Sequence, residues 1–196
     1  MSGISRVCAA PVLVVLRIGA DHRVGGWAKT PRGARGWDLV LSPYQDVPDL
    51  SEFEPNAVIP LAGGKWEAIH AIFAERPDLL ADRALIWLPD DDLEGDADAV
   101  ARLFAIARAK DLDLCQPALT PDSAFSHFVT VRHLLTKLRY TNFVELMAPL
   151  MTPSVLRAAL PEMRGRAGAK GLDFVWRRFV RPPADRRVAV IDACAM

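Results

Sequence analysis

The sequence has few cysteines and no excess of either charge, and each absence weakens the case for a class of protein. Its 196 residues include three cysteines and no CxxC pair, which gives no support to zinc-ribbon or thioredoxin-like motifs. Cys8, Cys115 and Cys194 lie far apart, a pattern typical of buried thiols in a reducing compartment, so we expect a cytoplasmic protein. Lysine and arginine number 24, as do aspartate and glutamate, so the chain lacks the basic excess of a general nucleic-acid binder.

The sequence also lacks an apolar run long enough to cross a membrane. The longest run, residues 7–16, falls short of the roughly 18 residues that a spanning helix needs. A signal peptide is an alternative interpretation, because Arg6 precedes the run and Ala20 follows it. Arg17 and Asp21, however, end the run without a clean small-residue cleavage site. With 51% hydrophobic and 24% charged residues the composition is globular, and a buried strand is the better interpretation of the run.

Four apolar runs in the first half of the chain are continuous rather than alternating. Such runs indicate strands buried on both faces, as in the centre of a parallel sheet covered by helices. The predicted strands are residues 12–18, 38–42, 57–61 and 84–88.

Helical patterns follow the third and the fourth of these strands. Apolar residues within 66–73 lie on one face of a helix that ends before Pro77, and those within 100–107 form a second helix. We expect Asp96 and Asp98 to cap the second helix. The order of elements predicts an α/β fold with a mostly parallel, Rossmann-related central sheet flanked by helices.

The second half of the chain has shorter and less regular patterns. Its predicted strands are residues 112–119, 125–131, 143–151 and 188–192. Helices are predicted from Ser154, with Thr152 as part of its cap, and over residues 172–180, after a glycine-rich basic loop at 165–171. Because no repeat or clear linker interrupts the chain, we expect one domain over residues 1–196.

Three consecutive aspartates, Asp90, Asp91 and Asp92, follow the predicted strand at 84–88. Ligands of open α/β sheets bind at the carboxyl ends of strands. In an extended segment the side chains of Asp90 and Asp92 point the same way, so their carboxylates repel each other. A divalent cation such as Mg²⁺ or Mn²⁺ commonly neutralises such a pair. A solvated acidic loop that caps the next helix explains the triplet equally well from spacing alone.

Other polar residues near the predicted strands are weaker candidates. Lys65 follows two glycines and precedes a helix, a position where a lysine can bind phosphate. The favoured alternative is a plain loop in which Lys65 is solvated. Asp46 follows the second strand and is a weak candidate for contacting a base or ribose. His127 and His133 lack an HExxH context, which favours a structural or sugar-contacting role over metal binding.

An ordered series of motifs runs over roughly residues 60–192. The motifs are LIWLPDDDL at 85–93, CQPALTPDS at 115–123, His127 with Thr130 and Arg132, FVELMAP at 143–149, GLD at 171–173 with Trp176, and VAVID at 188–192. Together they resemble a family of uncharacterised glycosyltransferase-like proteins related to nucleotide-diphospho-sugar transferases with the GT-A fold. The first 60 residues match this family only in their general pattern of apolar and polar segments.

The resemblance implies a metal-dependent glycosyltransferase with a nucleotide-sugar donor and an unknown glycan or small-molecule acceptor. It implies that Asp90 and Asp92 hold a cation, Mn²⁺ or Mg²⁺, on the donor diphosphate. Asp173 would be the base that deprotonates the acceptor, and Glu145 would face the acceptor or donor sugar. The alternatives are a helix N-terminal aspartate for Asp173 and a buried ion pair with an arginine such as Arg132 for Glu145. The residues expected to bind the donor are Asp46, Lys65, Asp91, His127 and Arg132.

The expected organisation is a donor half at roughly 1–95 and an acceptor half at roughly 110–196. The resemblance also leads us to expect a further metal-ligating histidine just past Met196, so that the sequence is either truncated before this ligand or lacks it. A non-catalytic relative that binds a nucleotide or sugar is therefore the alternative function. A metal-dependent phosphohydrolase is a third and weaker hypothesis, because a nucleophilic aspartate followed by DxT or DxD is absent.

Overall fold

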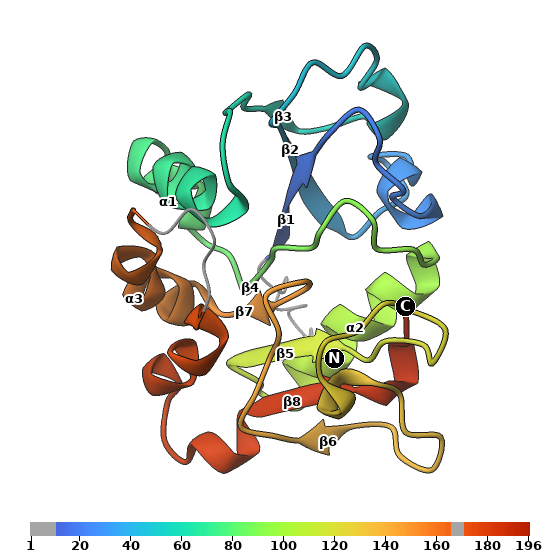
Figure 1. The fold of residues 1–196 in the computed structure, drawn as a ribbon, viewed down its shortest axis with the longest axis vertical. Helices are drawn as coiled ribbons and strands as arrows, with labels where there is room; N and C mark the ends of the chain where they lie inside the picture. The colour runs from blue at the N-terminus through green and yellow to red at the C-terminus, as the bar shows by residue number, and fades with distance from the viewer. Residues whose placement is uncertain (1–10, 166–170) are drawn as a thin grey trace, which may run out of the picture.

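The computed structural model describes residues 11–165 and 171–196, which form a mixed α/β structure around a central sheet (Figure 1). Within these ranges the sheet has eight strands in the order β3-β2-β1-β4-β7-β5-β8-β6. Their bounds are Val12–Ile18 (β1), Trp37–Pro43 (β2), Ala57–Val58 (β3), Leu85–Trp87 (β4), Leu114–Pro117 (β5), Arg139–Tyr140 (β6), Leu150–Met151 (β7) and Val188–Ile191 (β8). Cys8 and most of the glycine-rich segment lie outside the described residues.

The strand directions leave one edge of the sheet rich in carboxyl ends. Strands β1, β2, β3 and β4 pair in parallel, as do β5 and β8, while β7 runs antiparallel between β4 and β5. Strand β6 is antiparallel to β8 at the other end of the sheet. All strands except β6 and β7 therefore end at the same edge, and the segment that leads into β7 starts there as well.

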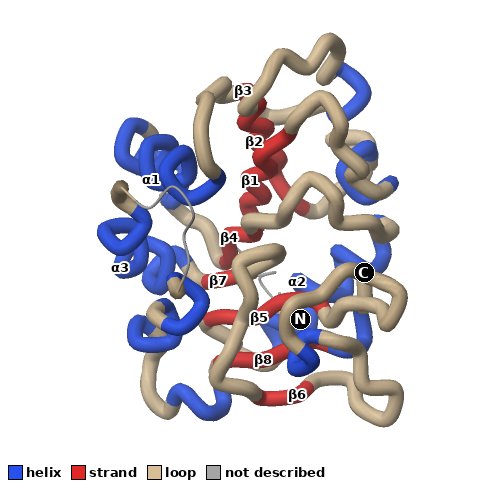
Figure 2. Tube along the Cα trace, in the orientation of Figure 1, coloured by secondary structure: helices blue, strands red, loops and turns tan. Residues whose placement is uncertain are grey.

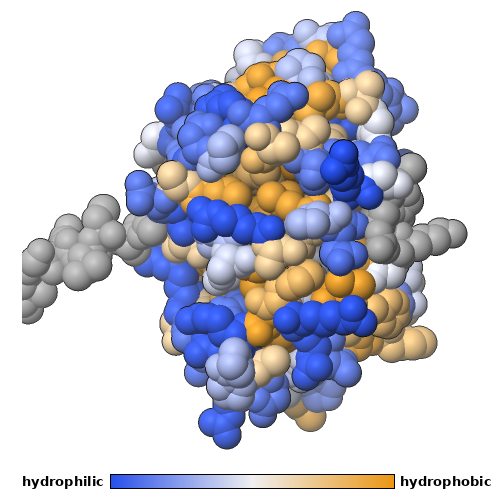
Figure 3. Space-filling view, turned by 90° about the vertical axis from the view of Figure 1, so that its left-hand side faces the viewer, coloured by the Kyte–Doolittle hydropathy of each residue, from blue (hydrophilic) through white to orange (hydrophobic). Residues whose placement is uncertain are grey.

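Both faces of the sheet are covered by helices (Figures 1 and 2). In β1, Val14 and Leu16 pack on the side of helix α2 (Ala97–Ala109), whereas Leu13 and Val15 pack on the side of α1 (Lys65–Glu75) and α3 (Pro153–Met163). The continuous apolar run of β1 is thus buried on both faces, as predicted. Figure 3 shows the outer face on the α1 and α3 side, where hydrophilic side chains surround smaller apolar patches.

Capping residues explain where two of the helices begin. The carboxylate of Asp96 accepts a hydrogen bond from the Ala99 backbone N–H at 2.6 Å, which satisfies an N–H at the start of α2. The hydroxyl of Thr152 accepts from the Val155 N–H at the start of α3. Cys115 and Cys194 are buried, as expected for core thiols.

Three of the predicted elements in the second half were wrong. Residues 125–131 contain a 3-10 helix, Phe128–Thr130, rather than a strand, because the Thr130 hydroxyl and N–H both bond back to the His127 carbonyl. The strand predicted at 143–151 is confined to β7, Leu150–Met151. Before it, the Leu146 carbonyl accepts from the Lys65 side chain, and the Met147 carbonyl accepts from Lys65 and from the Asp90 N–H.

The late helix was also wrong. Residues 172–180 form two 3-10 turns, Leu172–Phe174 and Trp176–Phe179, and the Trp176 indole donates to the Val144 carbonyl. Strand β6 was not predicted, because two residues are too few for a periodic pattern.

Candidate active site

Most of the candidate site residues lie on connections at one edge of the sheet. Gly19 follows β1, Tyr44 follows β2, and the acidic triplet follows β4, so parallel strands bring their side chains together. The segment before β7 reaches the same place from the opposite direction, because the Met147 carbonyl accepts from the Asp90 N–H at 2.8 Å. Antiparallel β7 therefore brings residues of the second half of the chain to the acidic triplet.

Asp91 holds the ends of three strands together. Its Oδ2 accepts hydrogen bonds from the Gly19 N–H at 2.8 Å and from the Tyr44 hydroxyl at 2.9 Å. Burial, with the hydrogen bond to Asp91, raises the pKa of Tyr44. Asp91 and Asp92 form a turn, so the extended conformation expected for the triplet was wrong. The two bonds to Asp91 and the Arg23 N–H that donates to its carbonyl stabilise this turn.

Asp90 forms an ion pair with Lys65, the first residue of α1. The Lys65 ammonium lies 2.5 Å from Asp90 Oδ1, and its side chain is only 15% exposed, so the solvated lysine expected from the sequence was wrong. Burial lowers the pKa of Lys65 and raises the pKa of Asp90, and in each case the charge of the partner opposes the shift. The opposite charge of each group thus offsets part of the cost of burying the other.

A cavity of about 240 Å³ lies beside this ion pair, and its lining residues are Arg17, Tyr44, Gly63, Lys65, Asp90 and Asp91. Arg17 is 3% exposed, and burial lowers its pKa. Its guanidinium donates to the Leu61 carbonyl at 2.6 Å and to the Gly63 carbonyl at 2.7 Å. Arg17 thereby holds the β3–α1 loop over the cavity. A charged residue at the end of a long apolar run is a signal for such a role. The sequence shows it at Arg17, but Arg17 was interpreted only as the end of the run.

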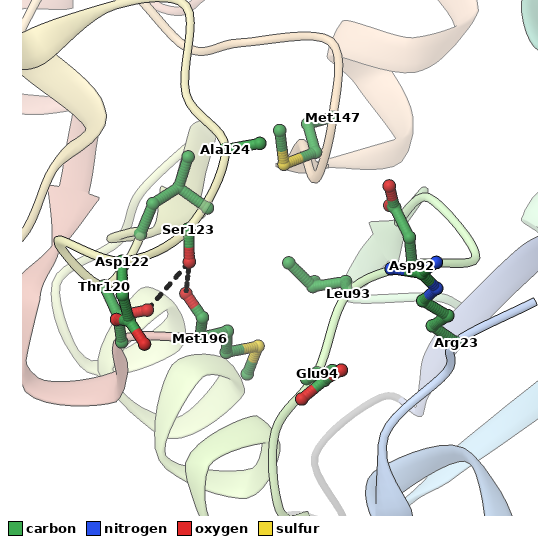
Figure 4. A pocket seen from close by; sticks show the side chains of 11 residues that line it. Arg23, Asp92, Leu93, Glu94, Thr120, Asp122, Ser123, Ala124, Met147 and Met196 are labelled. Atoms are coloured by element: carbon green, nitrogen blue, oxygen red, sulfur yellow. Dashed lines mark hydrogen bonds between the residues drawn. The ribbon is translucent and has the colours of Figure 1, made fainter.

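Asp92 faces a second cavity, of about 350 Å³ (Figure 4). Asp92 is exposed and lies on one side, near Arg23, while Met147 forms another wall. On the opposite side the Ser123 hydroxyl bonds to Thr120 Oγ1 at 2.7 Å. The triplet thus separates two cavities, with Asp90 lining the smaller and Asp92 the larger.

The donor set of the triplet is compatible with a divalent cation. Within residues 11–165 and 171–196, no group of three or more histidine, cysteine or acidic side chains converges in a way that holds a metal ion. Mg²⁺, however, commonly takes one or two carboxylates and completes its shell with water and substrate phosphate. In the described ranges the Asp92 carboxylate and the second oxygen of Asp90 make no hydrogen bond to the protein, and the charge of Asp92 contributes to the raised pKa of Asp90 although the two side chains line different cavities.

Glu145 and His127 form a second polar cluster. Glu145 is 7% exposed, its Oε1 lies 3.4 Å from His127 Nδ1, and its Oε2 has no hydrogen-bond partner in the described ranges. Gln116 accepts the Glu145 N–H at 2.6 Å and anchors the backbone. The alternative pairing of Glu145 with Arg132 was wrong: Arg132 is exposed and lines a different cavity, of about 380 Å³.

Asp173 lies near this second cluster. It is the middle residue of the turn Leu172–Phe174, is 7% exposed, and its Oδ1 lacks a hydrogen-bond partner among the described residues. The neighbouring Phe174 ring packs on Phe143 at a centroid distance of 5.3 Å, and Phe143 packs on His127 at 4.5 Å. Two buried carboxylates with unpaired oxygens therefore belong to adjoining segments. Asp46, by contrast, is exposed and lines neither of the cavities beside the acidic triplet.

The mixed sheet flanked by helices, with polar groups at the carboxyl edge of its strands, is an α/β fold that is similar to solved structures of S. aureus TarS. The crystal structure of S. aureus TarS 1-349 has a TM-score of 0.62 and 12% identity, over 94% of this chain and 59% of that chain. Its complex with UDP gives a TM-score of 0.61 at 12% identity, with the same coverage of 94% and 59%. The complex with UDP-GlcNAc gives 0.59 at 11%, over 94% and 57%.

The chain therefore spans less than two thirds of the TarS 1-349 chain, and at this identity the similarity establishes the fold. No family model matches the sequence, and no curated protein matches it. None of the helices in the described ranges combines the length and the apolar character of a membrane-spanning segment.

Proposed function

We propose that this protein transfers a glycosyl group from a nucleotide-diphospho-sugar, in the first instance a UDP-sugar, to a hydroxyl acceptor. The observation that carries the proposal is that a cavity lined by charged residues and an acidic triplet lie together at the carboxyl ends of β1, β2 and β4. The fold similarity to TarS, which has been solved with UDP and UDP-GlcNAc, supports the choice of donor. The buried thiols of Cys115 and Cys194 support a cytoplasmic location.

In this proposal the strand ends bind the donor. Arg17 keeps the β3–α1 loop in place over the smaller cavity, and Tyr44 and Asp91 keep the β4 turn against β1. Asp92 and the second oxygen of Asp90 would hold a divalent cation, which when bound supplies electrostatic stabilisation of the leaving diphosphate.

The acceptor would be activated by a carboxylate of the second cluster. Glu145 Oε2 and Asp173 Oδ1 have no hydrogen-bond partner in the described ranges, and such an oxygen would accept the proton of an acceptor hydroxyl that reaches it. We favour Asp173 as the base and Glu145, with His127 beside it, as the group that orients the acceptor. The aromatic contacts of Phe143 and Phe174 hold the two segments together.

One observation favours a second candidate, a relative that binds nucleotide or sugar without catalysis. Asp90 is already paired with Lys65, and Asp91 accepts two hydrogen bonds from the protein, so only Asp92 of the triplet is free of protein partners in the described ranges. One free carboxylate is enough for a protein that binds a nucleotide or sugar without catalysing transfer.

A thermal-stability screen with a panel of nucleotide sugars, with and without Mn²⁺, tests the proposal. Ligand at about 100 times its Kd adds about 2.7 kcal/mol of stability, a measurable shift. The shift should require Mn²⁺ and be lost in Asp90→Ala/Asp92→Ala, whereas Asp98→Ala, in the first turn of α2, should retain it. Binding followed by transfer or donor hydrolysis supports the enzyme, binding alone supports the second candidate, and no shift with any donor refutes both.

A further inference from the structure

Two neighbouring leucines, Leu134 and Leu135, are almost fully exposed, with 80% and 90% of their surface accessible. They are the central residues of a tight turn, in which the Thr136 N–H donates to the His133 carbonyl at 3.4 Å. Tight turns favour glycine, proline, asparagine, aspartate and serine, and apolar side chains that stay in water gain nothing from folding. The local structure of the turn therefore does not explain why leucine stands at both positions.

A single buried carboxylate holds both sides of this turn. Asp192 is 1% exposed. Its Oδ1 accepts from the His133 N–H at 2.8 Å, and its Oδ2 accepts from the Thr136 hydroxyl at 2.8 Å. Arg139, which follows the turn, donates to both oxygens of the same carboxylate. The leucines are thus held at a fixed tip, so that binding to a surface there costs little loop-ordering entropy.

The residues that flank the leucines carry positive charge. Residues 123–144 include no aspartate or glutamate. Arg132 and Lys137, on either side of the leucines, are exposed, and neither side chain forms an ion pair or a hydrogen bond with any residue that the structure describes. The charge of Asp192 beneath the turn is already compensated by Arg139. The turn therefore presents an apolar tip between two unpaired cations.

We propose that residues 132–138, the docking turn, bind the surface of an anionic lipid bilayer. Leu134 and Leu135 enter the interface, where burial of each apolar side chain is favourable, and Arg132 and Lys137 lie among the lipid phosphates. A bilayer fits this feature better than a protein does. The tip offers two apolar side chains on a single turn, whereas a stable protein partner takes about 800 Å² of well-packed surface.

Co-sedimentation with vesicles of equimolar phosphatidylcholine and phosphatidylserine tests the docking turn. Wild type should bind these vesicles, and should bind phosphatidylcholine alone more weakly. Leu134→Ser/Leu135→Ser should lower the partition constant by roughly tenfold per leucine, and the variant should fold because serine suits a turn. Val58→Ser is the matched control. Val58 is 44% exposed but belongs to β3, at the opposite end of the sheet from β6, so its replacement should leave binding unchanged.

Two further variants separate the contributions of charge and insertion. Arg132→Gln/Lys137→Gln should weaken binding to the anionic vesicles by about fivefold per charge and leave binding to neutral vesicles unchanged. Leu135→Trp places an indole at the tip, whereas the five tryptophans of the chain are all buried. Its fluorescence should shift to the blue on addition of anionic vesicles, because the indole leaves water, and the emission of wild type should not change.

Wild type that remains in the supernatant, equal sedimentation of wild type and Leu134→Ser/Leu135→Ser, or no shift for Leu135→Trp would overturn the proposal. Sedimentation equilibrium without lipid supplies one more outcome that overturns it. Dimers of wild type and monomers of the leucine variant would mean that the turn binds a second copy of the chain. No nucleotide sugar enters these measurements, and the four variant positions in the turn line neither cavity beside the acidic triplet. Failure of the docking turn therefore leaves the proposed function unaffected.

Discussion

Gly19 is the residue whose replacement tests the strand-end cluster most directly. A Cβ at this position would meet the Tyr44 hydroxyl oxygen, and would lie 2.5 Å from Tyr44 Cζ and 2.8 Å from Cε2. Contacts this close cannot persist, so Gly19→Ala must displace the Tyr44 ring. The displaced ring loses its hydrogen bond to Asp91. A hydrogen bond to a charged group contributes about 1.5–3 kcal/mol to stability. We expect the free energy of unfolding to fall by about this amount.

Urea denaturation followed by tryptophan fluorescence measures the loss, and two further variants test its cause. Gly33→Ala is the matched control, because nothing lies within 4 Å of a Cβ there, and its effect should stay within about 0.5 kcal/mol. In a Tyr44→Ala background, which removes the ring, Gly19→Ala should cost little. An equal cost of Gly19→Ala in both backgrounds would refute the reasoning.

Three further variants and treatments test other parts of the structure. Trp176→Phe keeps an aromatic ring but leaves the Val144 carbonyl without its donor. The free energy of unfolding in urea should therefore fall by about 1–3 kcal/mol, and no loss would show that water replaces the indole N–H as the donor. Asp192→Ala breaks a buried ion pair with Arg139 and should cost about 3–5 kcal/mol. Burial opposes ionisation of Asp192, but bonds from Arg139, the His133 N–H and Thr136 lower its pKa, so its stabilisation holds above the ordinary value of 3.8 and is lost on further acidification. Wild type should therefore lose more stability in acid than Asp192→Ala does, and parallel pH curves would contradict this. Burial raises the pKa of Cys194 to about 12, so iodoacetamide at pH 8 should label it only after denaturation, as mass spectrometry of the native protein would reveal.

The sequence predicted the first half of the fold well because its signals there are local and strong. The run at 12–18 coincides with β1, and the predicted helices at 66–73 and 100–107 lie within α1 and α2. The spacing of apolar residues predicts such elements, because it shows which residues of a segment are buried. In the second half, short strands such as β6 and β7 depend on partners far away in the chain. The segment before β7 likewise contacts groups that are distant in the chain, since Lys65 donates to the carbonyls of Leu146 and Met147.

The candidate site was predictable in outline but not in its pairings. The acidic triplet at the end of β4 was visible, because a polar cluster after a buried run is a local pattern. That Asp90 would pair with Lys65, and Asp91 with Tyr44, depends on which loops meet across the sheet. Sequence spacing carries no information on contacts of that kind. The same limit explains why the contact of Glu145 with His127 was not predicted, and why pairing with Arg132, one of the two alternatives for Glu145, was wrong.

The position of β7 also has a consequence for how the chain folds. This two-residue strand lies between β4 and β5 and pairs with both, through Ile86 and Leu114 on either side of Met151. Strand β4 pairs with β1 on one side, but its other edge has no partner until this segment from much later in the chain has arrived. Nucleation within β1 and β2 is local, but closure of the sheet must await the return of the chain. Synthesis on the ribosome therefore leaves the edge of β4 unpaired until β7 has emerged, a period in which this edge is open to other strands.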